Sequence, residues 1–322
     1  MIKLDVKDRQ ILYQLDLNAR QSYSQIAKKV RLSKEVVQYR VKKLQDRGLI
    51  KYFMTVIDSN KLGYILFRCF VKCQNLDLKK EKEIIDFLKP RVGWVVNIRG
   101  KWDFNIAVWK KNIYDFIYFW TDFYTMFSDV ILDYTSNPIP RMWLYRRGWL
   151  LHETQDTSEF DVWGGSSDKV DIDDLDYDIL SLLVKDARKP SLEIARQLSV
   201  SEGTVRFRLK RLEEKKVILR YVAFLDTAAM GMKYIKLHFH VKNVTPDKIK
   251  QIREYAHIHP HILYSNEAVG GHFLEFDLNV TSQEHLYTII DDFREKFSEV
   301  IRDYEFFEYV QEHKFEYLPQ ER

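Results

Sequence analysis

Apolar residues recur at helical spacing in the first fifty residues of the chain. Ile11, Leu12 and Leu15 share one helical face, and Ile26 and Val30 share a face of the next segment. A third stripe with i, i+4, i+7 spacing follows them. The pattern predicts three short helices, over residues 5–17, 22–30 and 34–47.

After these helices the pattern changes to alternation. Runs such as ILFRCFVKC, WVVNIRGKWDFNIAVW and VILDYTS alternate apolar and polar residues, as half-buried strands do. They enclose two helical runs, KKEKEIIDFLKP and NIYDFIYFWTDFYTMF. The order βαββαβ predicts a ferredoxin-like sheet with helices on one face.

The whole pattern occurs twice. The segment that begins at Asp8 matches the segment that begins at Asp176 without a gap, at an offset of 168 residues. The helical blocks agree in identity, as at Arg40 and Arg208, and the strand-rich stretches agree in pattern. Duplication of a two-domain unit explains both halves.

Between the copies, HETQDTSEFDVWGGSSDKVDID is acidic and polar and contains a Gly-Gly-Ser-Ser run, which predicts an exposed linker. Each third helix is followed by a β-prone segment, DRGLIKYFMTVID or EKKVILRYVAFLD, expected to form a wing and to join two domains. The expected parts are a helix-turn-helix at 1–54, an α/β domain at 55–150, a linker at 151–171, a second helix-turn-helix at 172–222 and a second α/β domain at 223–322.

The third helix of each block is the candidate reader of DNA, because the second helix of a helix-turn-helix enters the major groove. Ser33 and Ser201 stand where an N-cap is needed, and the second copy is the more basic. A basic helix is by itself most often a solvated face, but two copies within this pattern favour DNA. The candidate contacts are Ser33, Lys34, Gln38, Arg40, Lys42, Lys43, Ser201, Thr204, Arg206, Arg208, Lys210 and Arg211.

Composition limits the class of protein. The chain has 46% hydrophobic and 30% charged residues and a net charge of +4, so affinity for DNA must come from local clusters of Lys and Arg. No apolar run of about eighteen residues and no signal-like apolar core appear, so we expect a cytoplasmic protein with no membrane partner. Cys69 and Cys73 fit neither a CxxC pair nor a zinc knuckle and are expected to be reduced core thiols.

The blocks LDVKDRQIL…NAR…SYSQIAKKVRLSKEVVQYRVKKL and LDYDIL…DAR…SLEIARQLSVSEGTVRFRLKRL both resemble the leucine-responsive regulator family, Lrp/AsnC. The resemblance implies an α+β chain, a tandem duplication of a winged helix-turn-helix and a ferredoxin-like βαββαβ (RAM-type) regulatory domain. It also implies double-stranded DNA as partner and small effectors, often amino acids. Because both units lie in one chain, the copies are expected to pair as a pseudo-dimer that can associate further, and their unlike reading helices predict an asymmetric operator.

The segment RGKWDFNIAV resembles the glycine-aspartate loop of that family. The resemblance places Gly100, Trp102 and Asp103 in an effector region. The second copy offers Gly270 and Gly271, without an aspartate directly after them. The alternative is a glycine-permitted turn before a strand.

Siroheme decarboxylases also resemble this family and supply an alternative function, a tetrapyrrole enzyme. The segments that correspond to their histidine- or arginine-rich stretch, DSNKLGYILF and DTAAMGMKYI, contain no histidine. No nucleophile with its base, phosphate loop or paired carboxylates stands out, so we expect no enzyme and no cofactor. A regulator that binds a protein instead of DNA also stays open. Histidines that could share a strand face and hold a metal cluster in the second copy, although no metal is expected: His238, His240, His257, His259, His261 and His272.

Overall fold

The computed structural model describes residues 2–151, 160–270 and 274–319. Two groups of three helices form the two helix-turn-helix units, as predicted. The reading helices begin at Ser33 and Ser201, which accept hydrogen bonds from the backbone N–H of Val36 and Thr204. The predicted N-caps are therefore confirmed. The six helices are α1 (Val6–Leu17), α2 (Tyr23–Val30), α3 (Lys34–Asp46), α6 (Asp174–Lys185), α7 (Ser191–Gln197) and α8 (Glu202–Glu214).

Each copy also contains the predicted βαββαβ order, which confirms the α+β class. The elements of the first copy are β2 (Ile65–Cys73), α4 (Leu78–Leu88), β3 (Trp94–Arg99), β4 (Phe104–Lys110), α5 (Ile113–Met126) and β5 (Ile131–Ile139). Those of the second copy are β9 (Lys233–Val241), α9 (Pro246–Ile258), β10 (Ile262–Glu267), β11 (Leu274–Val280), α10 (Gln283–Lys296) and β12 (Ile301–Phe315).

The copies exchange strands, so that a single ten-stranded sheet runs through both, in the order β5-β2-β4-β3-β12-β9-β11-β10-β6-β7. The long β12 pairs with β9 of its own copy and, further along, with β3 of the first copy. In return β6 (Arg141–Leu144), which follows β5 directly, pairs with β10 of the second copy. The pairing predicted between the two α/β domains is therefore an intertwined one.

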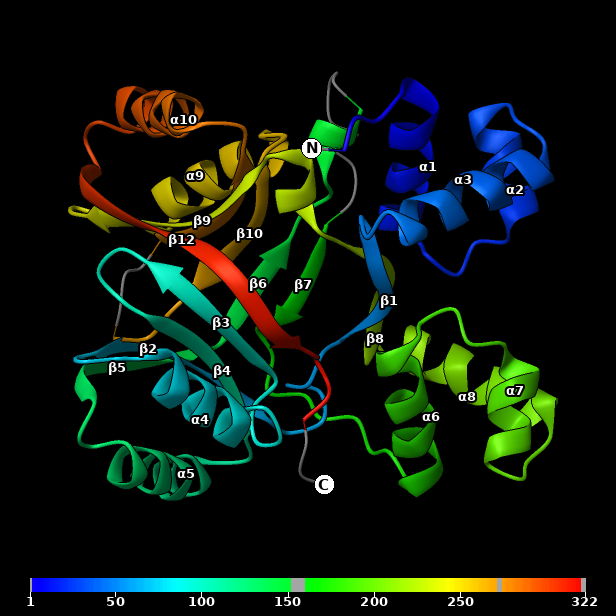
Figure 1. Cartoon of the computed structure of the whole chain (residues 1–322), viewed down its shortest axis with the longest axis horizontal. Helices are drawn as coiled ribbons and strands as arrows, with labels where there is room; N and C mark the ends of the chain where they lie inside the picture. Colours follow the sequence, from blue (N-terminus) through cyan, green and yellow to red (C-terminus); the bar gives the residue numbers. More distant parts are fainter. Residues whose placement is uncertain (1, 152–159, 271–273, 320–322) are drawn as a thin grey trace.

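The two halves of this sheet each carry helices on their outer face and turn their inner faces toward the middle of the molecule (Figure 1). Helices α4 and α5 pack on the first half in a separate apolar core, which includes the buried free thiols of Cys69 and Cys73. Helices α9 and α10 pack on the second half in the same way. A third core joins the inner faces to the helix-turn-helix units.

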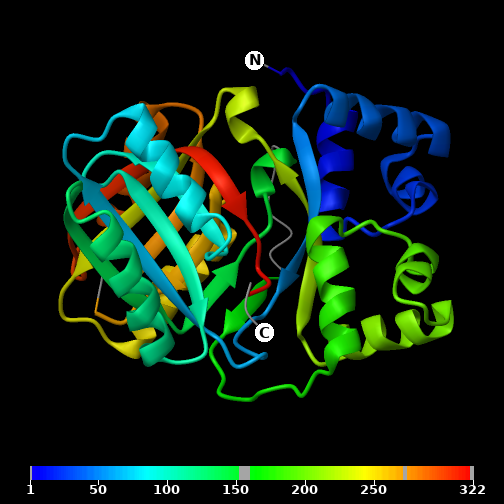
Figure 2. The same ribbon diagram turned by 60° about the horizontal axis from the view of Figure 1, so that its bottom comes forward.

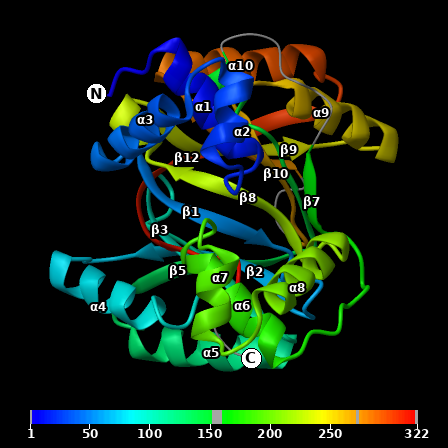
Figure 3. The same cartoon turned by 90° about the vertical axis from the view of Figure 1, so that its right-hand side faces the viewer.

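The strands predicted after the reading helices are β1 (Ile50–Ile57) and β8 (Ile218–Leu225), and they pair with each other antiparallel as a central ribbon. Each helix-turn-helix is anchored to the strand of the other copy. The N–H of Ala19 donates to Tyr221 O at 2.7 Å, and the N–H of Ala187 donates to Phe53 O at 2.9 Å. The ribbon runs between the two units, which lie on one side of the molecule (Figures 2 and 3).

The expectation of an exposed linker is wrong for part of its length. Strand β7 (Asp161–Gly164) pairs with β6 at the edge of the large sheet. Trp163 is fully buried, and its Nε1 donates to Ile57 O at 3.1 Å. One large apolar side chain outweighs its polar neighbours, because its burial removes a large apolar surface from water. Two short 3₁₀ turns, η1 (Gly148–Leu150) and η2 (Thr227–Met230), complete the described elements.

Among the described residues, no helix is both long and apolar enough to cross a membrane.

Candidate DNA-binding surface and central cavity

The reading helices α3 and α8 bury one face each and leave the opposite face to solvent. The buried stripes are Val37, Val41 and Leu44 in α3 and Val205, Leu209 and Leu212 in α8. On the outer faces, the exposed predicted contacts are Lys34, Gln38, Lys42, Lys43, Arg206 and Lys210. Their amide, ammonium and guanidinium donors suit base edges and phosphates.

Three of the predicted DNA contacts are held inside their own domain instead. Arg40 pairs with Asp5, the N-cap of α1, and with Asp8 in the first turn of that helix, both at 2.7 Å. In the second copy Arg208 pairs with Asp173 at 2.6 Å, and Arg211 pairs with the buried Asp176. The sequence could not show these pairs, because the partners lie more than thirty residues away. These arginines hold each reading helix against the first helix of its unit.

Sequence reasoning missed one exposed pair on the reading helices. Tyr39 and Phe207 are 65% and 66% exposed, although aromatic side chains usually find cover. They stand at the same position of the repeat, on the outer faces of α3 and α8. An apolar ring there suits contact with a thymine methyl group. The available signal was an aromatic residue that falls outside the apolar stripe in both copies.

The two outer faces differ where a reading helix begins. Gln38 of the first copy corresponds to Arg206 of the second, and Lys34 corresponds to Glu202. Arg206 lies over Glu202, with Nε and Nη2 at 3.0 and 2.6 Å from Oε1. This exposed i,i+4 pair contributes little to stability, so Arg206 can exchange it for another acceptor at small cost.

The predicted effector loop is tied to the neighbouring strand. Asp103 accepts a hydrogen bond from the N–H of Cys73 at 2.7 Å and pairs with Lys72 at 3.2 Å. Trp102 is buried, with its ring 6.0 Å from that of Phe70. Gly100 has φ +129, which favours glycine. This geometry is that of a turn, and a ligand at Asp103 would compete with the groups it already binds.

The register of the second copy is also defined. Strand β10 ends at Glu267 and β11 begins at Leu274, whereas β3 ends at Arg99 and β4 begins at Phe104, so the second copy has two more residues between these strands. From this point the repeat offset is 170 residues instead of 168. Gly270 has a positive φ, as Gly100 has, and Gly271 lies outside the described residues.

The histidines of the second copy separate into different places. His238 lies between the two sheet halves, with Nδ1 3.3 Å from Glu305, whereas the His257 ring stacks on Tyr145. The rings of His259 and His261 lie 6.1 Å apart, and burial lowers the pKa of each to about 4. His272 lies outside the described residues. Within the described part of the chain, no group of three His, Cys, Asp or Glu residues is placed to hold a metal ion.

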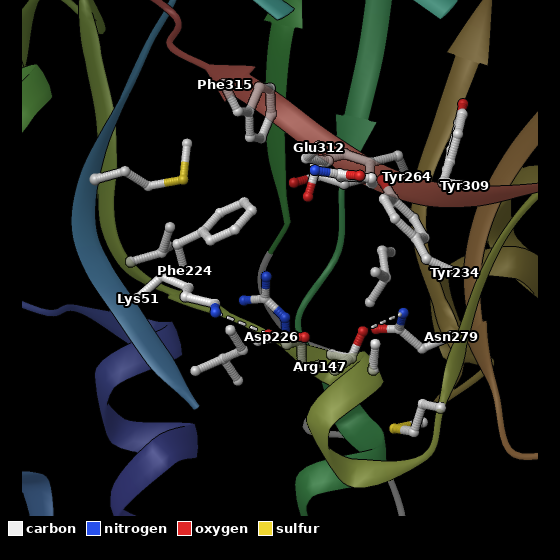
Figure 4. Close-up of a pocket in the computed structure, with 18 of the residues that line it drawn as sticks. Lys51, Arg147, Phe224, Asp226, Tyr234, Tyr264, Asn279, Tyr309, Glu312 and Phe315 are labelled. Carbon is white, nitrogen blue, oxygen red and sulfur yellow. Dashed lines mark hydrogen bonds and ion pairs between the residues drawn. The ribbon is translucent and has the colours of Figure 1, made fainter. Parts of the chain in front are cut away.

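A central cavity of about 860 Å³ lies between the ribbon and the inner face of the second half of the sheet (Figure 4). The ribbon supplies one wall, where Phe224 is prominent, and β9, β10 and β12 supply the other, with Tyr234, Tyr264 and Tyr309. At the rim Lys51 pairs with Asp226 at 3.0 Å. The cavity has the size of a small-molecule site.

Buried arginines lie beside this cavity. The Arg147 guanidinium pairs with Asp16, and the backbone N–H of Arg147 donates to the same carboxylate at 2.9 Å. Burial alone would raise the pKa of Asp16, but the charges of Arg147 and Arg220 lower it below its usual value. On the opposite wall, burial raises the pKa of Glu312 to about 7, despite the hydrogen bond donated by Trp94 Nε1 at 2.7 Å.

Comparison with known proteins supports a helix-turn-helix domain in each copy. Residues 172–213 match the model of the AsnC-type helix-turn-helix domain, and residues 4–51 match that of a winged helix-turn-helix DNA-binding domain. An HTH-type transcriptional regulator from Pyrococcus horikoshii is 31% identical over 124 residues, which are 38% of this chain and 77% of the relative. The regulator FL11 from the same organism is 26% identical over 38% of this chain and 80% of its own length.

The fold of the whole chain also has a counterpart. The crystal structure of the siroheme decarboxylase NirDL matches 97% of this chain and 93% of its own, with a TM-score of 0.61 and 15% identity. At that identity the match shows the shared architecture alone. Each of the two Pyrococcus regulators matches 38% of this chain, a share no larger than one of its two copies. The chain belongs to the Lrp/AsnC family of DNA-binding transcriptional regulators and contains two fused copies of the family's unit.

Proposed function

We propose that one chain binds an asymmetric DNA site as a pseudo-dimer, with α3 on one half-site and α8 on the other. The observation that carries the proposal is that both helix-turn-helix units lie on one side of the molecule and are joined through the central ribbon (Figure 3). In symmetric dimers two identical helices read a palindrome. Here the ribbon joins two unlike helices, so the two half-sites need not match.

The residues at equivalent positions indicate what each helix prefers. Gln38 can form a bidentate pair with adenine, and Arg206 can form one with guanine. Lys42 and Lys210 occupy the same repeat position, are exposed in both copies, and suit phosphate contacts that carry no sequence information. The expected operator has phosphate contacts related by the pseudo-two-fold axis and a different base at the symmetric position of each half.

Selection of binding sites from a random duplex library tests this proposal. Wild-type protein should select two unlike half-sites. Arg206→Ala should relax the guanine preference in one half at a cost of about 1–3 kcal/mol, and Gln38→Ala should relax the other half. Arg302→Ala, which removes an exposed arginine from β12, is the matched control. A palindromic optimum, or no selected sequence at low salt, would overturn the proposal.

A comparison of Lys210→Ala with Arg206→Ala separates phosphate contacts from base contacts. Lys210→Ala should weaken binding to all sequences about equally and reduce the slope of log affinity against log salt by about one. Arg206→Ala should change sequence preference more than this slope. Arg208→Ala is unsuitable for the comparison, because Arg208 holds α8 to the residues that start α6.

A tetrapyrrole enzyme is the second candidate, because NirDL matches the chain over nearly its full length. A structure of NirDL was solved with an iron-uroporphyrin III analogue, which supplies a probe. The regulator proposal expects no saturable change in the absorbance of that iron tetrapyrrole when protein is added. A saturable change in a protein that selects no DNA sequence would favour the enzyme.

A further inference from the structure

The central cavity occupies one of two equivalent places in the pseudo-dimer, although residues of both copies line it. Asn279 lines it, whereas the first copy has Trp109 at the equivalent position. Trp109 fills its own site so closely that a Cβ on Gly93 would lie 1.7 Å from the indole ring. Beside Trp109 and Tyr317 the hollow measures only about 40 Å³. Of the two equivalent spaces in the pseudo-dimer, the one beside Trp109 is therefore almost filled and the one beside Asn279 is open.

The open cavity has one flat apolar wall. Phe224 and Tyr52 of the ribbon stack with ring centroids 4.7 Å apart and planes 6° apart. Met54 and Val222 continue this wall, and Phe315 closes one end. In Figure 4 the Phe224 ring and the labelled tyrosines border the same space. A planar apolar group would have rings on both sides there.

Two arginines that line the cavity also carry buried N–H donors without acceptors. The Nε of Arg147 and the Nη1 of Arg220 have no hydrogen-bond partner in the described structure. The Arg220 side chain is only 7% exposed, and it shares its carboxylate, Asp161, with Arg146. An unsatisfied buried donor on a charged group is costly, and an anion bound against these guanidinium groups would offset their charge.

The remaining charges around the cavity are mostly paired. Lys51 pairs with Asp226 at 3.0 Å, and Lys233 pairs with Glu308 at 3.1 Å. Glu312 is the acid that opposes an anion, and it stands on the wall opposite the arginines. The wall of the cavity is therefore positively charged near Arg147 and Arg220 and apolar along the ribbon.

We propose that this cavity is a ligand site that takes one small organic anion per chain, with a planar apolar body along the ribbon and a carboxylate or sulfonate at Arg147 and Arg220. The site is separate from the reading helices and from the loop at Asp103. The proposal does not depend on DNA binding and is tested without DNA.

The probe is 1-anilinonaphthalene-8-sulfonate, an anion with a planar naphthalene ring that fluoresces when it leaves water. The full chain should bind one probe per chain. Arg220→Met should weaken this binding at least tenfold, and Asp161 keeps its ion pair with Arg146 at 3.1 Å in that variant. Ala228→Trp, a substitution at the exposed rim, should block entry. Arg302→Met, which removes a cation far from the cavity, should bind like wild type.

The uncharged analogue N-phenyl-1-naphthylamine separates charge from shape. It should bind wild type and Arg220→Met equally, and Ala228→Trp should exclude it. Thermal melts of all variants, expected within a few degrees of wild type, verify folding. Equal binding of the anionic probe by wild type, Arg220→Met and Ala228→Trp, or no bound probe, would overturn the proposal.

Discussion

The buried carboxylate of Asp176 shows how single residues fix the position of a reading helix. It lies at the start of α6, completes a capping box with Asp173, and faces Arg208 at 3.2 Å and Arg211. The first copy repeats the arrangement with Asp8 and Arg40. Because Asp176 is fully buried, its removal takes away the reciprocal bond of the capping box and leaves two arginines without their shared partner.

We therefore expect Asp176→Ala to lower the free energy of unfolding by about 2 kcal/mol, since loss of a buried charged hydrogen-bond partner has costs of this order. Urea denaturation followed by circular dichroism measures the change. Asp291→Ala, at an exposed carboxylate on α10, is the control and should change stability by less than about 0.5 kcal/mol. Equal losses in both variants would contradict the role assigned to Asp176.

The ionisation of Glu312 predicts how the affinity of the cavity for an anion changes with pH. This prediction rests on the cavity proposal. Its pKa of about 7 means that it is mostly neutral at pH 6 and mostly charged at pH 8. The anionic probe should therefore bind several-fold more tightly at pH 6, where repulsion from Glu312 is weakest. Arg147, Asp226 and Asp277 also act on Glu312, and burial lowers the pKa of His313, which keeps that imidazole neutral in this range.

Probe titrations at both pH values measure the effect. Glu312→Gln should bind the probe with an affinity that does not change between pH 6 and pH 8. If that variant keeps the wild-type pH dependence, another group carries it.

At the scale of elements, the sequence predicted what is local. Helical spacing placed α1 to α3 within a residue or two, and alternation placed the strands of both α/β domains. Which strands pair is decided by contacts between distant residues. The pairing of β1 with β8, and of β12 with β3, joins residues more than 160 positions apart and leaves no periodic signal in either segment.

Strand β7 lies in a segment whose polar composition predicted an exposed linker. Polar residues and glycines surround Trp163, so the segment resembles a linker, yet the structure buries the indole against the ribbon. We expect Trp163→Ala to lower the free energy of unfolding by about 3–5 kcal/mol, as large-to-small changes in cores do. Phe160→Ala, three residues earlier at a half-exposed position, is the control and should cost much less. Similar urea midpoints for the two variants would mean that β7 is not part of the folded core.

At the scale of the molecule, the DNA-binding surface was predictable and the central cavity was not. A reading helix is continuous in the sequence, so its exposed cations follow from one stripe of apolar residues. The cavity draws on residues from Lys51 to Phe315, which only the fold brings together. The two equivalent places of the pseudo-dimer differ because of exchanges such as Trp109 for Asn279. These two residues can be aligned only when the two extra residues between β10 and β11 are taken into account.

The same asymmetry extends to the charges buried between the sheet halves. Arg68 and Lys236 occupy equivalent positions of the two copies. Both are neutralised by the second copy, where Glu275 lies 3.4 Å from Arg68 and 2.9 Å from Lys236, and Asp277 lies 3.0 Å from Lys236. The first copy has Asn105 and Ala107 where the second has these acids. Two first copies facing each other would bury two arginines with neither carboxylate, so the charges favour pairing between unlike halves.

This complementarity can be tested in the full chain. The double variant Glu275→Gln, Asp277→Asn leaves Arg68 and Lys236 buried without carboxylates, and we expect the free energy of unfolding to fall by about 3–5 kcal/mol. Replacing both cations by methionine in that background should restore most of the loss, because buried ion pairs can often be exchanged for apolar residues of similar volume. Urea denaturation of the wild type, the double variant and the quadruple variant measures both steps. A double variant as stable as wild type would show that the acids do not bind the two halves together. A quadruple variant no more stable than the double would show that shape, and not charge, selects the unlike partner.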